Sequence, residues 1–221
     1  MNWEDYFQSW QATKGQPGPL ASQHLDSARR KVRENSSEDW LWLSDALHDS
    51  KRKTFVALVF QKQPVPKRLL KCFLQAAVLE ENPSLNRYFI EPCVRSWGWI
   101  AVSQQLLEHL QKGNNAERAG AASAFYWVHG NPRNEDIAPM KQRIRSAMLR
   151  EFVHNKCSHV RQRIIPMLTF DSALYPAEDH SFLLDAINIA RSSSDEYIAH
   201  RIEVQLGNGG PFKPIPTVGS K

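Results

Sequence analysis

The amino-acid sequence predicts an all-α protein arranged as an α-solenoid. Apolar residues recur every three or four positions in several segments, whereas strict apolar–polar alternation over five or more residues is hard to find. Glycine, at 10 of 221 residues, is too scarce for an all-β chain rich in tight turns. A short polar motif also recurs at the spacing of helical repeats. Together these observations predict about ten helices joined by short loops.

Amphipathic periodicity places the individual helices. Residues 65–81 have apolar side chains at helical spacing, with Lys67, Arg68 and Lys71 on the opposite face. Three further segments show the same pattern: 37–48, 137–153 and 179–191. Residues 116–128 differ because their apolar side chains surround the helix, so this helix is expected to be covered on several faces.

A polar residue followed three positions later by arginine occurs four times, each at the start of an expected helix. The pairs are Asp49–Arg52, Ser84–Arg87, Asn115–Arg118 and Ser158–Arg161, and a fifth copy at Ser194 lacks the arginine. The polar residue is expected to cap the helix that follows. Because the helix dipole disfavours a cation in the first turn, each arginine is expected to contact the neighbouring repeat.

The segment from Pro139 to Phe170 resembles a HEAT repeat. Pro139 lies near the start of its first helix, Asn155 lies in the turn, and Val160-Arg161 opens the second helix. The resemblance implies a right-handed α-solenoid of about five HEAT-like helix pairs. The expected pairs span 37–63, 66–96, 97–128, 137–170 and 179–206.

The sequence departs from the family pattern at several positions. The family usually has Asp where Asn155 stands, and Glu81 holds the equivalent place before Arg87. Ala46 and Lys112 occupy that place in two other copies, so the Asp–Arg ladder of the family is incomplete. Two prolines, Pro92 and Pro166, fall inside expected helices and should kink them.

Two segments lie outside the expected repeat domain at residues 21–206. Residues 1–20 form an aromatic N-terminal capping segment and linker, in which Asn2 caps a helix carrying the stripe Trp3, Tyr6, Phe7 and Trp10. This helix closes the first repeat or, alternatively, enters a groove on a partner. Residues 207–221, rich in glycine and proline, are expected to be a disordered tail.

Composition restricts the class of protein. No apolar run is long enough to span a membrane, and the start is no signal peptide, so a cytoplasmic protein is expected. The odd number of widely spaced cysteines suits reduced thiols, with Cys72 and Cys93 buried and inert. His154, Cys157 and His159 lack the second ligand pair of a zinc site. No cofactor, metal or catalytic residue is therefore expected.

The charge distribution points to an acidic protein partner. The net charge of +5 is concentrated in residues 51–150, whereas the two ends of the chain are acidic. We expect a non-enzymatic scaffold, monomeric alone, that holds its partner on a basic surface. The expected contacts are Arg52, Arg87, Arg118, Lys141, Arg143, Arg145, Arg150, Arg161 and Arg163. The repeated arginines alternatively form a structural ladder beneath that surface.

A nucleic-acid-binding protein is the alternative. The cations of residues 141–163, together with Trp97, Trp99 and Trp127, provide charges for phosphates and rings for bases. A HEAT-like fold with these residues is similar to the alkylpurine DNA glycosylases. That resemblance implies a groove with tryptophans and an aspartate, for which Asp136 is the nearest residue. The tryptophans alternatively belong to the core.

Overall fold

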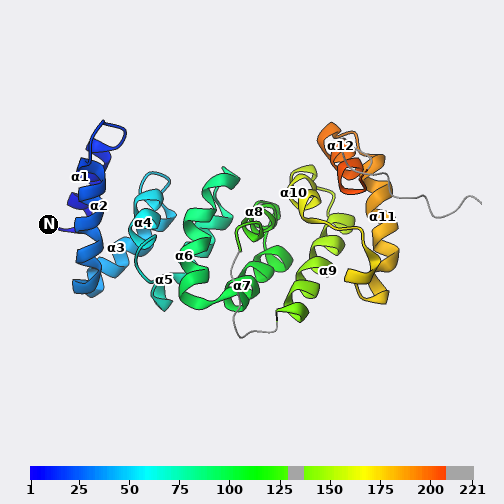
Figure 1. Cartoon of the computed structure of the whole chain (residues 1–221), viewed down its shortest axis with the longest axis horizontal. Coiled ribbons are helices and arrows are strands. Elements are labelled where there is room, and N and C mark those ends of the chain that lie inside the picture. Colours follow the sequence, from blue (N-terminus) through cyan, green and yellow to red (C-terminus); the bar gives the residue numbers. More distant parts are fainter. Residues whose placement is uncertain (129–136, 208–221) are drawn as a thin grey trace, which may run out of the picture. The chain divides into compact units, whose positions relative to one another are not determined.

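The computed structural model describes residues 1–128 and 137–207, and this part of the chain is all-helical, without a strand (Figure 1). It contains twelve α-helices where about ten were expected. They are α1 (Trp3–Thr13), α2 (Leu20–Lys31), α3 (Ser37–His48), α4 (Lys53–Phe60), α5 (Lys67–Val78), α6 (Arg87–Trp97), α7 (Trp99–Lys112), α8 (Asn115–Phe125), α9 (Ala138–His154), α10 (Ser158–Ile164), α11 (His180–Arg191) and α12 (Glu196–Gln205).

The helices form two compact units. Of the described residues, 1–102 and 127–128 make the first unit, and 103–126 and 137–207 make the second. The expected domain boundaries at residues 20 and 206 stay a prediction, although α1 and α2 belong to the first unit. Apart from Gly207, the expected tail at 207–221 lies outside the described residues.

In the first unit the helices pack in two alternating rows. Consecutive helices form the pairs α1–α2, α3–α4 and α5–α6. The first helices of the pairs contact one another in order, α1 with α3 and α3 with α5. The second helices do the same, α2 with α4 and α4 with α6. Each pair therefore buries its apolar face against the next pair along the chain.

The second unit repeats this alternation. The first helices α9 and α11 are in contact, and the second helices follow in the order α8, α10, α12. Helices α9 and α10 form one pair, and α11 and α12 form another. The five expected helix-pair ranges contain α3 to α12, two helices each, with α6 extending one residue beyond its range.

The aromatic N-terminal helix is confirmed. Asn2 caps α1 through a reciprocal pair of hydrogen bonds with Asp5, and Trp3, Phe7 and Trp10 are buried. The aromatic stripe packs on Phe55 of α4, whereas Leu41 of α3 is exposed. Helix α1 also packs against α2, and the two form a pair.

Several expected local features differ from the structure. Asp49 accepts hydrogen bonds from the amides of Lys51 and Arg52, as a cap should. Elsewhere the expected caps are wrong: Asn114 and Asp195 cap α8 and α12 instead of Asn115 and Ser194. Asn82 caps a 3-10 turn before α6, and neither α6 nor α10 has a side-chain cap. Helix α10 ends at Ile164, so Pro166 lies in a following 3-10 turn rather than in a kinked helix, whereas Pro92 lies inside α6.

Candidate functional site

Two of the repeated arginines bind the carboxyl ends of the preceding helices. Arg118 donates to the carbonyl of Gly113 at 2.7 Å and to that of Gln111 at 3.3 Å, both at the end of α7. Arg161 donates to the carbonyls of Phe152 at 2.9 Å and Val153 at 3.1 Å, at the end of α9. These carbonyls have no partner within their own helix, so each guanidinium satisfies them and complements the helix dipole.

The same arrangement occurs in the first unit with residues that sequence reasoning missed. Arg29 of α2 donates to the carbonyls of Leu58 and Val59 at the end of α4. Arg95 of α6 donates to the carbonyls of the next two residues, Phe60 and Gln61. Arginines from both neighbouring helices therefore hold the carboxyl end of α4. No sequence motif marks these contacts, because a backbone carbonyl carries no side-chain signature.

Arg52 joins the aromatic N-terminal helix to the first unit. Its guanidinium lies 3.3 Å from the Glu4 carboxylate and stacks over the rings of Phe7 and Trp42, at 5.9 and 5.7 Å from their centroids. The Trp42 indole also donates to Glu4. Arg52 thus helps to fix α1 on α3 and α4.

Arg87 differs from the other three because it is exposed. Its guanidinium lies over the ring of Tyr88 at 4.8 Å and over the ring of Trp127 at 6.0 Å. It also donates to the Tyr88 hydroxyl, a hydrogen bond that raises the pKa of the guanidinium. The four arginines of the motif therefore have different environments: three make structural contacts and one lies on the surface.

The three tryptophans proposed to contact bases are tied to the backbone of the first unit. Trp97 donates to the carbonyl of Val65 at 2.7 Å, and Trp99 donates to Val128 at 3.0 Å. Trp127 donates to Pro83 at 2.8 Å. Trp99 is buried, and the other two are partly buried. Their indole N–H groups are thus used inside the fold, while Asp136 lies outside the described residues.

The cations of residues 141–163 lie in the second unit and are not alike. Lys141 and Arg143 are exposed on α9, and the described residues show no ion pair for either. Arg145 and Arg163 are partly buried, and Arg163 donates to His159. Arg150 donates to Asp179 at 2.6 Å, and Asp179 is fully buried at the start of α11. Arg150 therefore anchors α11 on α9.

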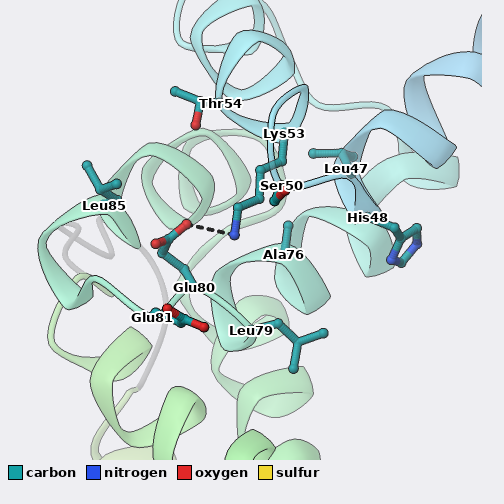
Figure 2. A pocket seen from close by; sticks show the side chains of 10 residues that line it. All are labelled: Leu47, His48, Ser50, Lys53, Thr54, Ala76, Leu79, Glu80, Glu81 and Leu85. Atoms are coloured by element: carbon teal, nitrogen blue, oxygen red, sulfur yellow. Dashed lines mark ion pairs between the residues drawn. The ribbon is translucent and has the colours of Figure 1, made fainter.

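One surface cleft in the first unit lies where α3 and α4 meet the end of α5. It has a volume of about 440 Å³ and is lined by Leu47, His48, Ser50, Lys53, Thr54, Ala76, Leu79, Glu80, Glu81 and Leu85 (Figure 2). The Lys53 ammonium contacts the Glu80 carboxylate at 2.8 Å, and their side chains are only 16% and 9% exposed. Glu80 also accepts from the amide of Asn82. This ion pair ties α4 to the loop after α5.

The second cleft is a groove between α3 and α5. It has a volume of about 380 Å³ and is lined by Ser37, Trp40, Leu41, Ser44, Arg68 and Leu69. Leu41 is 65% exposed. The Arg68 guanidinium lies 5.2 Å from the centroid of the Trp40 ring. This groove, hereafter the α3–α5 groove, combines an apolar surface with a cation.

The cysteines and histidines singled out from the sequence lie in different environments. Cys93 is buried, which raises the pKa of its thiol, whereas Cys72 is half-buried, in contrast to the expectation, and its Sγ lies 3.2 Å from the Ser44 hydroxyl. Within residues 1–128 and 137–207, no three His, Cys, Asp or Glu side chains are placed to hold a metal ion. His154 instead packs on the ring of Phe182.

Among the described helices, none is both long and apolar enough to cross a bilayer. Comparison with protein-family models, curated proteins and solved structures gives no match. The arguments about function therefore depend on the helices and side chains of this chain alone.

Proposed function

We propose that the chain is a non-enzymatic, HEAT-like α-solenoid module that binds an acidic segment of a partner protein. The observation that carries this proposal is the alternating packing found in each unit: successive pairs from α1 to α6, and the pairs α9–α10 and α11–α12, contact each other through both their first and their second helices. Such packing leaves a row of helices on each face, and extended rows of this kind are binding surfaces in repeat proteins.

The use of arginines inside the fold supports the repeat assignment. Arg118 and Arg161, at equivalent places of successive pairs, both bind the carbonyls that end the preceding helix. A shared structural contact explains why arginine recurs at a helical position that the dipole disfavours. Arg118 and Arg161 then form the structural ladder, and other cations bind the acidic partner.

Exposed cations supply the charge for an acidic partner. On α5, Lys67, Arg68 and Lys71 are exposed, and on α9 so are Lys141 and Arg143. For Lys67, Lys71, Lys141 and Arg143, the described structure shows neither an ion pair nor a hydrogen bond of the side chain. Cations without an internal partner attract anionic groups and steer their approach.

The nucleic-acid alternative has less support. Base stacking needs exposed rings beside cations, but Trp99 is buried and the indoles of Trp97, Trp99 and Trp127 are held by backbone carbonyls. The aromatic residues belong to the first unit, whereas the cations of residues 141–163 belong to the second. Binding of nucleic acid is therefore measured in parallel, in the experiment described next.

The test is a selection from a random-peptide display library with the full chain as bait. We expect enrichment of peptides rich in Asp and Glu at physiological salt. A short labelled DNA duplex is titrated in parallel between about 50 and 200 mM salt. The proposal is overturned if only neutral or basic peptides are enriched, or if no peptide is enriched. Binding of the duplex with a steep loss on adding salt would then favour the nucleic-acid alternative.

A further inference from the structure

We propose that the α3–α5 groove is the docking site for this partner, and that its occupant is an acidic segment with one large apolar anchor. The anchor packs against Trp40 and Leu41, and the carboxylates of the segment bind the cations of α5. This inference rests on the proposed function and adds to it the site and the pattern of the partner sequence.

One wall of the groove is a partly exposed stripe of α3 whose apolar residues are Trp40 and Leu41. Ser37, Trp40, Leu41 and Ser44 lie on one face of α3, at the spacing that places successive turns above one another. Other apolar residues of α3, such as Leu43 and Leu47, are buried in the first unit. Leu41 therefore presents an apolar side chain where the packing of the fold does not require one. A volume of about 380 Å³ accommodates one large side chain of a partner.

Charge on the α5 side of the groove selects an acidic occupant. Lys67, Arg68 and Lys71 are all exposed in the first two turns of α5, and this helix contains no acidic residue. Helix α5 follows Pro66 without a side-chain cap, so its amino end also favours negative charge. The carboxylates of a partner thus meet three cations and the positive end of a helix dipole.

The opposite wall gives the partner an orientation. Helix α3 carries the exposed carboxylates Glu38 and Asp45 near Leu41. These groups repel an acidic residue placed over α3 and direct the acidic side of the partner toward α5. Arg68 lies over the Trp40 ring. The groove therefore recognises an apolar anchor with acidic residues on one side of it.

The larger cleft is a weaker candidate because its charges are already used. Lys53 and Glu80 neutralise each other at close range, and Glu80 also accepts from a backbone amide. A ligand there would have to break a largely buried ion pair. In the α3–α5 groove, by contrast, Arg68 makes only the cation–π contact with Trp40. The α3–α5 groove thus offers both apolar and charged groups to a partner.

The test measures binding of a fluorescent peptide, taken from the display selection, to full-length variants. Leu41→Glu places a like charge in the groove, and we expect it to weaken binding by at least about tenfold. Its matched control is Leu184→Glu, because Leu184 is 66% exposed on α11 of the second unit. We expect this control to change affinity by less than about twofold. Both substitutions affect exposed side chains, and thermal melting checks that each variant folds.

A second pair of variants tests the charge. Lys71→Glu should weaken binding of the acidic peptide, whereas Lys112→Glu makes the same charge change at the end of α7, where Lys112 is 74% exposed, and should not. The peptide with its anchor residue changed to Ala should also lose affinity. If an acidic peptide binds the parent chain and Leu41→Glu equally well, the groove assignment is overturned while the proposed function stands. If no acidic peptide is selected, the proposed function itself is overturned.

Discussion

Replacing Arg118 with methionine tests the structural role of the repeated arginines. The guanidinium donates to both carboxylate oxygens of Glu151 at 2.7 Å and to two carbonyls at the end of α7. The two side chains of this pair are 27% and 12% exposed. Removing one partner of a fully buried pair costs about 3–5 kcal/mol. Partial exposure lets water replace some of the contacts, so we expect a loss of about 2–3 kcal/mol.

The assay is thermal unfolding followed by circular dichroism. For a chain of this length, one kcal/mol corresponds to about 2–4 °C, so Arg118→Met should lower Tm by about 4–12 °C. Lys112→Gln is the control, because Lys112 is 74% exposed and its i,i+4 pair with Glu108 is worth about 0.3–0.5 kcal/mol. A shift for Arg118→Met no larger than that of the control would refute the assignment. Adding Glu151→Gln completes a double-mutant cycle that isolates the pair.

Two further predictions concern the ends of the described fold. A chain beginning at Ala21 loses the buried Trp3 and Trp10, each worth about 3–5 kcal/mol of stability. It should therefore melt far below the parent in thermal scans or aggregate in size-exclusion chromatography. An unchanged melt with a monomeric peak would mean that α1 is not part of the core. Hydrogen bonds from Ser158 and Gln162 lower the pKa of Asp195. The Asp195 carboxylate therefore stabilises the fold above its unfolded-state pKa of about 3.9, and this stabilisation is lost as pH falls through its folded-state pKa. The Tm difference between the parent and Asp195→Asn should therefore shrink below about pH 4, and a difference that stays constant from neutral to acid pH would contradict this linkage.

Many helix positions were predictable because apolar residues recur at helical spacing within the helix. The stripe of α1 and the helices α3, α5, α8, α9 and α11 follow from apolar spacing, whereas the ranges that contain α4, α6, α7, α10 and α12 come from the resemblance to HEAT repeats. Helix α2 was missed because Ala28 is its one buried residue, and α2 begins after Pro19 without a side-chain cap. The capping residues were misplaced by one or two positions, since several polar neighbours compete and backbone geometry decides among them.

The candidate site was less predictable because it depends on contacts between distant segments. The cations Lys67, Arg68 and Lys71 could be placed on the outer face of a helix from the sequence. That Leu41 stays exposed beside them follows from how α3 packs on α5, about 30 residues along the chain. The internal roles of Arg29 and Arg95 depend on carbonyls a similar distance away, which leave no trace in side-chain patterns.

The central claim is that a basic repeat surface binds an acidic partner. Hydrogen–deuterium exchange of the full chain, with and without a selected acidic peptide, tests it most directly. Bound peptide should slow amide exchange in the first turns of α3 and α5, around residues 37–44 and 67–72, and leave α11 and α12 unchanged. Protection confined to α11 and α12, or produced by a DNA duplex and not by the peptide, would contradict the account.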